Sequence, residues 1–361
     1  MKRNGPGGTK NAKKCDKCGT DAKIHLGYGP HDYCAECFMR FFEHRVRKTI
    51  RVNNLVKAGN RVLVGVSGGK DSLVTLFLLN KIFGPSISIE ALMIDEGIPG
   101  YREKALKIAK QHCTNWNIPF TVVSHKEEFG KTTSDIFHAI GADNAKESAC
   151  AYCGPMRREI LNKYARAGNF DRLATGHNLD DECQSILMNV FDNDVKRMQR
   201  LGPIAGRDGK GFEQQRGSAI ADSAPNQPDG TGSMVPRIKP LYLSPEREVI
   251  AFAAFAGIES YSEECCPFSW QAKRNAFRET LNGMEEKFPG SKFKIIGFLE
   301  GFKKMAGAEK PPAKKHGAQK QKNKNGKGAQ GLLAKRLSGL EKKTRATRGD
   351  RALSCATTKR G

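Results

Sequence analysis

Two closely spaced pairs of cysteines are the first feature of the sequence that could do chemistry. Cys15 and Cys18 form one CxxC pair, and Cys34 and Cys37 form a second pair after fifteen intervening residues. Four thiolates at this spacing suit the tetrahedral coordination of a structural Zn²⁺ ion. Binding of the metal would contribute about 10–16 kcal/mol to a segment too small to fold alone. We therefore predict a zinc site formed by these four cysteines.

A third CxxC pair, Cys150 and Cys153, stands alone in the segment CAYCGPMRRE. No second pair lies near it in the sequence, so a closed four-cysteine zinc site is not available. A redox role, a metal cluster or an incidental pair remain open from spacing alone. The adjacent Cys265 and Cys266, in the segment YSEECCPFSW, offer a third thiol from elsewhere in the chain.

The segment SGGKDS, residues 67–72, lies between the apolar run RVLVGV and a helical pattern. Its glycines let backbone N–H groups approach an anion, and the following helix adds its own free N–H groups and the positive end of its dipole. Asp71 would repel a phosphate unless it holds Mg²⁺ or orients another group. The segment also lacks the GxxxxGK[ST] spacing of a Walker loop. The predicted phosphate-binding residues are Ser67, Gly68, Gly69, Lys70, Asp71 and Ser72.

The segment GHNLDDE, residues 176–182, follows the apolar run RLAT. Asn178 is a good helix N-cap, and the acids after it favour a first helical turn. That structural role alone would account for the acids. It does not account for Gly176 and His177 at the end of an apolar strand.

Apolar runs alternate with helical patterns between residues 59 and 204. The runs RVLVGV, SIEALMID, FTVVSH and RLATGH are separated by helical patterns such as YREKALKIAKQHC, which predicts an α/β fold with a parallel sheet. We expect a basic leader over 1–13, a zinc module with a linking helix over 14–58, and a nucleotide-binding domain over 59–204. An insertion over 205–235, a helical part over 236–302 and a lysine-rich tail over 303–361 complete the prediction.

SGGKDS resembles the pyrophosphate loop of the PP-loop ATPases, and GHNLDDE resembles the second signature of one branch, the tRNA 2-thiolation enzymes of the TtuA type and their eukaryotic cytosolic counterparts. The resemblance covers residues from about 15 to 302 outside the insertion. It implies that Gly176 and His177 lie by the nucleotide, that Asp181 or Asp180 is a catalytic or Mg²⁺-linked acid, and that the backbone at Ile94, in MIDEGIPGY, contacts adenine.

The resemblance also implies a [4Fe–4S] cluster held by Cys150, Cys153 and a cysteine that precedes a proline. We assign Cys266, which lies directly before Pro267, and Cys265 remains an alternative because this cysteine is doubled here. Some relatives instead pass sulfur as a persulfide through the CxxC pair. Arg157 resembles a basic position near the family's active site, although a surface ion pair would explain it equally well. The expected catalytic residues are Cys150, Cys153, Asp71, Asp181 and Arg157.

We therefore predict a tRNA uridine 2-thiolase that uses ATP, Mg²⁺, Zn²⁺ and a [4Fe–4S] cluster, adenylates the C2 carbonyl oxygen and releases AMP and pyrophosphate. The family implies tRNA as substrate and a ubiquitin-like thiocarboxylate protein or sulfide as sulfur donor. Whether two copies or another subunit assemble is left open. A cytidine 2-thiolase and a non-catalytic RNA-binding subunit are the alternatives.

Charge is concentrated at the C-terminal end of the chain. Residues 303–361 carry +15 of the formal charge of +23, which suits nonspecific attraction to phosphate backbones or a solubilising tail. No apolar stretch reaches the length of a membrane span, and no apolar segment follows the basic N-terminus. We expect a cytoplasmic protein without membrane contact, whose 11 cysteines are kept reduced.

Overall fold

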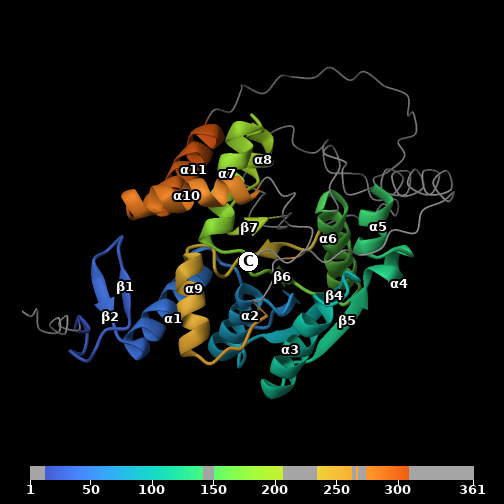
Figure 1. Ribbon diagram of the computed structural model, residues 1–361, viewed down its shortest axis with the longest axis horizontal. Coiled ribbons are helices and arrows are strands. Elements are labelled where there is room, and N and C mark those ends of the chain that lie inside the picture. Colours follow the sequence, from blue (N-terminus) through green and yellow to red (C-terminus); the bar gives the residue numbers. More distant parts are fainter. Residues whose placement is uncertain (1–12, 141–149, 206–233, 262–265, 267–273, 309–361) are drawn as a thin grey trace, which may run out of the picture.

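The computed structural model describes residues 13–140, 150–205, 234–261, 266 and 274–308. These residues form an N-terminal module, a central sheet with helices on both faces, and a helical C-terminal part (Figure 1). The strands are β1 (Ile24–Leu26), β2 (His31–Tyr33), β3 (Arg61–Val66), β4 (Ser88–Asp95), β5 (Phe120–Ser124), β6 (Arg172–Ala174), β7 (Ile204–Ala205) and β8 (Arg237–Ile238). The helices are α1 (Ala35–Val52), α2 (Lys70–Phe83), α3 (Arg102–Asn115), α4 (His125–Phe129), α5 (Thr133–Ile140), α6 (Cys150–Ala167), α7 (Leu179–Phe191), α8 (Val195–Gln199), α9 (Glu246–Phe255), α10 (Arg274–Lys287) and α11 (Ser291–Ala308).

The central sheet has the strand order β5-β4-β3-β6-β8-β7. Neighbouring strands from β5 to β8 run parallel, and β7 pairs with β8 in the antiparallel direction at one edge. The predicted α/β fold is therefore confirmed, with one antiparallel edge strand in addition. Periodicity does not predict β7 and β8, because each has only two residues.

Alternate side chains of β3 point to opposite faces of the sheet, as the pleat requires. Val62 and Val64 pack into the larger core together with residues of α2, α3 and α9. Leu63 packs into a second core together with Ile160 and Ala165 of α6. Helices on both faces therefore hold the carboxyl ends of the neighbouring strands β3 and β6 side by side, where open α/β sheets place their ligands.

The C-terminal helices form a separate layer on α7. Leu179 and Ile186 of α7 share an apolar core with Leu281 of α10 and Leu299 of α11. This core fixes the first turn of α7, which carries the acids of GHNLDDE, against two helices that come from more than 90 residues later in the chain. Within the described ranges, no helix is long and apolar enough to cross a membrane.

Candidate active site

The SGGKDS segment forms a tight turn from β3 into α2. Gly68 has a φ of +83°, and a Cβ atom at this position would lie 2.2 Å from the carbonyl oxygen of Ala105 in α3. Both the backbone conformation and the close approach therefore require glycine. Gly69 is the N-cap of α2 and offers no side chain to bond the first N–H groups of the helix. These N–H groups and the helix dipole suit an anion.

The two serine hydroxyls stabilise the turn from within. Ser72 Oγ accepts the Ser67 N–H at 3.1 Å and donates to the Gly69 carbonyl oxygen at 2.9 Å. The Gly69 N–H donates to Ser67 Oγ at 3.3 Å. In this structure both hydroxyls shape the loop, and any contact with a phosphate would come in addition to that role.

Lys70 lies at the mouth of the loop between two carboxylates. Its Nζ is 2.8 Å from Glu246 Oε1 and 3.2 Å from Asp71 Oδ2. Burial on its own would lower the pKa of Lys70, but the two carboxylates outweigh burial and raise it. Burial raises the pKa of Asp71 above its ordinary value even though Lys70 and Asn178 oppose that shift. Lys70 is therefore held in its charged form beside the free N–H groups of α2.

The GHNLDDE segment is in direct contact with the SGGKDS loop. A Cβ atom at Gly176 would lie 2.7 Å from the backbone of both Asp71 and Ser72, so this position also requires a glycine. Asn178 Nδ2 donates to Asp71 Oδ1 at 2.9 Å. The two predicted nucleotide segments, more than 100 residues apart in the sequence, are therefore adjacent in the fold.

Asn178 is the N-cap of α7, as predicted. Its Oδ1 accepts the Asp181 N–H at 3.1 Å, and Asp181 Oδ2 accepts the Asn178 N–H at 3.2 Å, which completes a capping box. His177 Nδ1 lies 2.9 Å from Thr175 Oγ1. Burial, reinforced by nearby positive charges, lowers the pKa of His177 to about 3, so its ring is neutral at physiological pH.

Each of the three acids that follow is paired with a different basic residue. The pairs are Asp180 with Lys292 of α11, Asp181 with Arg274 of α10 at 3.3 Å, and Glu182 with Lys239 at 2.6 Å. Asp180 and Glu182 are buried, whereas Asp181 is less enclosed. Burial raises the pKa of Asp181 despite the opposing charge of Arg274. Of the two acids proposed for catalysis, Asp181 is therefore the better placed.

A buried arginine directly follows the predicted adenine segment. Arg102 donates through Nε and Nη2 to the Ile94 carbonyl oxygen at 2.8 and 2.6 Å, and through Nη1 to the Ser67 carbonyl oxygen at 2.6 Å. It also pairs with the buried Glu96. The Ile94 carbonyl oxygen is therefore already engaged, and Arg102 joins the end of β4 to the start of the SGGKDS loop.

The thiols of the third CxxC pair lie on α6, at its first turn. Burial raises the pKa of both Cys150 and Cys153. The nearby Cys266 thiol also raises the pKa of Cys153, and the Cys153 and Cys266 thiols both raise the pKa of Arg157. Arg157 Nη1 is 3.7 Å from Glu96 Oε1, so the arginine joins the thiols to the buried Arg102–Glu96 pair. Cys265, the alternative third cysteine, lies outside the described residues.

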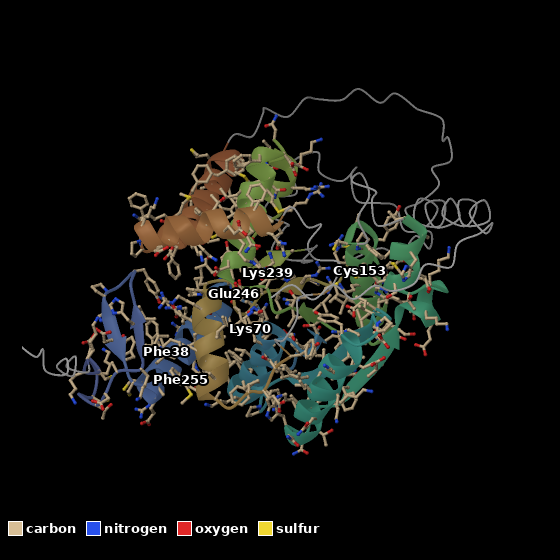
Figure 2. All side chains as sticks on the ribbon, in the orientation of Figure 1. Phe38, Lys70, Cys153, Lys239, Glu246 and Phe255 are labelled. Carbon is tan, nitrogen blue, oxygen red and sulfur yellow. The ribbon has the colours of Figure 1, made fainter. Side chains whose placement is uncertain are left out.

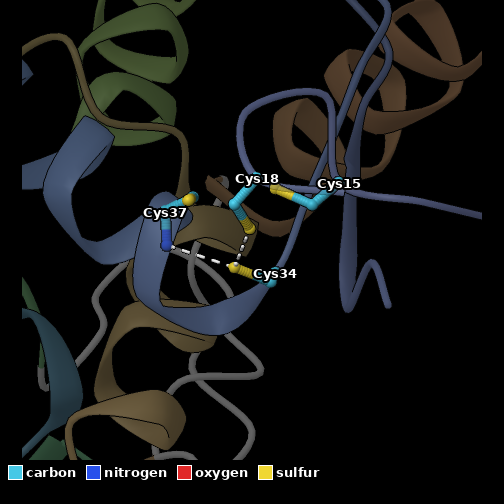
Figure 3. Close-up of side chains that lie close together, drawn as sticks. All are labelled: Cys15, Cys18, Cys34 and Cys37. Carbon is cyan, nitrogen blue, oxygen red and sulfur yellow. Dashed lines mark hydrogen bonds between the residues drawn. The ribbon is translucent and has the colours of Figure 1, made fainter. Parts of the chain in front are cut away.

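The N-terminal cysteines do form a compact group (Figure 3). The sulfur atoms of Cys15, Cys18, Cys34 and Cys37 all lie within 4.8 Å of one another, as the ligands of a single tetrahedral ion do. In the described part of the chain this is the one group of three or more His, Cys, Asp or Glu side chains that meets such a criterion. Cys150, Cys153 and Cys266 do not meet it, and a cluster of several irons separates its ligands more widely than one ion does.

Glu96, Arg102 and Glu246 belong to this site but were not selected from the sequence. Glu96 lies within the quoted segment MIDEGIPGY and Arg102 directly follows it, and their charges after a buried strand are the signal. Glu246 follows Ser244 and Pro245, a pattern that marks the start of a helix. That local pattern does not indicate the ion pair with Lys70. Figure 2 shows Lys70 and Glu246 together near the middle of the molecule, with Cys153 on the side of α6.

Comparison with known proteins agrees with this geometry. A family model described as a PP-loop domain matches residues 41–285. The chain is 36% identical over 288 residues to the tRNA-5-methyluridine(54) 2-sulfurtransferase of Pyrococcus horikoshii, covering 80% of this chain and 82% of that protein. It is 34% identical over 290 residues to the cytoplasmic tRNA 2-thiolation protein 1 of Malassezia globosa, covering 79% and 76% respectively. The chain belongs to the PP-loop family of tRNA 2-thiolation proteins.

A solved structure of this family has the same fold. The U34-tRNA thiolase NcsA from Methanococcus maripaludis, described with its [4Fe–4S] cluster, superposes with a TM-score of 0.64 at 31% sequence identity. The match covers 81% of this chain and 87% of that protein.

Proposed function

We propose that this protein is an ATP-dependent tRNA uridine 2-thiolase. The observation that carries the proposal is the contact between SGGKDS and GHNLDDE, where Asn178 holds Asp71 at 2.9 Å and Gly176 lies against the backbone of the loop. Family membership and the names of the relatives, which thiolate tRNA, support the same reaction.

The reaction requires activation of a poor leaving group. The C2 carbonyl oxygen of uridine attacks the α-phosphorus of ATP, the bond from that phosphorus to pyrophosphate breaks, and an adenylated base forms. A sulfur nucleophile then attacks C2, the C2–O bond breaks, and AMP leaves with the oxygen. The SGGKDS loop with Lys70 would bind the pyrophosphate part, and Arg157 would stabilise the negative charge that develops on the oxygen. Asp71 and Asp181 would hold Mg²⁺.

Two metal centres belong to the proposal. Cys15, Cys18, Cys34 and Cys37 would hold a structural zinc ion, which their geometry fits. Cys150, Cys153 and Cys266 would hold a [4Fe–4S] cluster, since thiolates are the ligands of such clusters and Cys266 is close enough to influence Cys153. Held by these three cysteines, such a cluster would supply an iron at which the sulfur for the transfer can bind.

The substrate would be tRNA, and the sulfur would come from a thiocarboxylate on a ubiquitin-like protein or from sulfide. The relatives modify uridine 34 or uridine 54, so these are the two candidate positions that fragment mapping distinguishes. A cytoplasmic location is part of the proposal because the fungal relative is named as cytoplasmic.

The test is an anaerobic reaction of the full-length protein, with its cluster reconstituted, with ATP, Mg²⁺, sulfide and unmodified tRNA. Digestion and mass spectrometry should detect 2-thiouridine, and mapping of fragments would locate it. Cys153→Ser should abolish the product, whereas Cys113→Ser, on α3 outside the site, should retain it. Thiocytidine would identify a cytidine thiolase instead. No thionucleoside from protein that binds ATP and holds its cluster would favour a non-catalytic RNA-binding subunit.

A further inference from the structure

Glu246 makes a contact that the proposed reaction does not explain. The residue is the first of α9, and its carboxylate reaches across to Lys70, the lysine of the SGGKDS loop, at 2.8 Å (Figure 2). The two residues are 176 positions apart in the sequence. An anion is thus already bound to the lysine that would receive a phosphate.

The position of Glu246 is fixed from the GHNLDDE segment. The backbone N–H of Glu246 donates to Asp180 Oδ2 at 2.8 Å. Asp180 is buried and pairs through its other oxygen with Lys292, which also donates to Asn282 Oδ1 at 2.8 Å. A chain of contacts therefore runs from α11 through α7 to the first residue of α9, and from there to Lys70.

Glu246 is in its ionised form at neutral pH. Burial acts to raise the pKa of its carboxyl, but Lys70, Arg278 and Lys292 outweigh burial, and the pKa lies below its usual range. The start of a helix also favours a negative charge. Both side chains of the pair remain about one quarter exposed, so a ligand in water can reach them.

We propose that Glu246 is a built-in counter-anion of Lys70, the phosphate-binding lysine. The pyrophosphate part of the nucleotide displaces the Glu246 carboxylate from the Lys70 ammonium group. The inference rests on the proposed function, because it assumes that the SGGKDS loop binds pyrophosphate. The carboxylate competes with the phosphates for the same ammonium group and repels them. It therefore weakens the binding of pyrophosphate and speeds its release after adenylation.

This role predicts that neutralising Glu246 increases the affinity for pyrophosphate, whereas a purely structural ion pair predicts no increase. Glu246→Gln keeps the shape of the side chain and removes its charge, so Lys70 becomes free for the ligand. We expect the variant to bind pyrophosphate about threefold to tenfold more tightly than the wild type, as befits the loss of one partly exposed charge pair. In the Lys70→Gln background, Glu246→Gln should give a much smaller gain, because the ammonium group for which the carboxylate and the phosphates compete is gone and only their direct repulsion remains.

The experiment is calorimetric titration of the full-length protein with inorganic pyrophosphate, for the wild type, E246Q, K70Q and the double variant. Glu103→Gln removes an exposed carboxylate from the first turn of α3 and should leave the affinity unchanged. Unfolding temperatures measured in parallel show that each variant is folded.

The outcomes separate the two proposals. Tighter binding by E246Q that is largely lost in the K70Q background supports the counter-anion. Equal or weaker binding by a folded E246Q, with a wild type that binds pyrophosphate, overturns the counter-anion and leaves the thiolase untouched. A gain of the same size in the K70Q background also overturns it. A wild type that binds neither ATP nor pyrophosphate would remove the basis of both proposals.

Discussion

At the scale of single residues, the site is built from charges whose partners come from distant parts of the chain. Asp71 and Lys70 come from one segment, Asn178 and Asp181 from a second, and Glu246 from a third. Burial raises the pKa of Asp71 and Asp181, and each carboxylate faces a cation or an amide that holds it in place. Such groups suit a reaction in which negative charge is redistributed among phosphate groups.

Asp181→Asn tests the catalytic role of the less enclosed acid. An amide oxygen can still accept the Asn178 N–H of the capping box, so the start of α7 should persist. The loss of the negative charge should lower the rate of thiolation about 100-fold or more. The measurement is single-turnover formation of 2-thiouridine, with Asp192→Asn at the exposed end of the same helix as control. A variant that keeps the wild-type rate would exclude Asp181 from catalysis.

The lowered pKa of His125 predicts how the stability of the fold depends on pH. Burial, followed by the positive charges of Arg157 and Arg102, lowers its pKa from 6.5 to about 4. Because the folded-state pKa lies below the unfolded value, the unfolded chain takes up the proton first as the pH falls. The stability from neutral His125 is complete above about pH 6.5 and is lost toward pH 4, by up to about 3 kcal/mol.

Replacement by an uncharged residue should remove this dependence. In His125→Gln the free energy of unfolding, measured with urea, should fall less between pH 7 and pH 4.5 than in the wild type. His44→Gln, at an exposed position of α1, is the matched control and should keep the wild-type slope. Equal slopes in wild type and His125→Gln would refute the shifted pKa.

At the scale of elements, the turns that end β3 and β6 determine the site, because these strands are parallel neighbours. Each turn contains a glycine that lies against the backbone of another element, Gly68 against Ala105 and Gly176 against Asp71. The close contact brings the N-terminus of α2 against the segment that begins α7. The helix starts, more than the helices themselves, therefore form the candidate nucleotide site.

Gly176→Ala should disturb both segments. The added Cβ would lie 2.7 Å from the backbone at Asp71 and Ser72, so the loop has to shift. We expect a loss of about 1–3 kcal/mol in stability and at least about tenfold weaker ATP binding, measured by thermal unfolding and calorimetry. Gly283→Ala, in α10 with open space around its Cβ, should instead gain about 0.5–1 kcal/mol. Unchanged ATP affinity in Gly176→Ala would contradict the close contact.

The local parts of this arrangement can be predicted from the sequence, and the distant pairings cannot. A strand, a glycine turn and a helix start are each encoded within a few residues, which is why SGGKDS and the N-cap Asn178 are recognisable. The partner of Lys70 lies 176 residues away, and nothing in the spacing of Glu246 points to it. Two-residue strands such as β8 escape notice because pairing with β6, and not their own pattern, makes them strands.

At the scale of the whole molecule, the N-terminal module is docked on the helix that carries Glu246. Phe42 of α1 stacks on Phe252 of α9 with ring centroids 4.8 Å apart, and Phe38 meets Phe255 edge-on at 5.9 Å. Both pairs belong to the main apolar core, and Figure 2 shows Phe38 and Phe255 at this junction.

A buried ion pair reinforces the docking. Arg45 Nη1 is 2.7 Å from Glu248 Oε2, and Tyr28 donates its hydroxyl to the other oxygen of Glu248 at 2.8 Å. Glu248 is fully buried, so the loss of either partner would leave an uncompensated charge. Glu248 lies two residues after Glu246 in α9, and the module therefore supports the helix start that faces Lys70.

Loss of zinc should therefore also weaken nucleotide binding. Cys18→Ser removes one ligand from the group of four without removing Cys34, whose sulfur caps α1. We expect the content of about one zinc per chain to fall toward zero, the unfolding temperature to drop, and ATP to bind more weakly because α9 loses its support. Metal analysis, thermal unfolding and calorimetry measure the three effects. Cys113→Ser, at a buried position of α3, should lower the unfolding temperature but retain the zinc. If Cys18→Ser lost its zinc and bound ATP as tightly as the wild type, the module would act independently of the site, and its docking on α9 would serve stability alone.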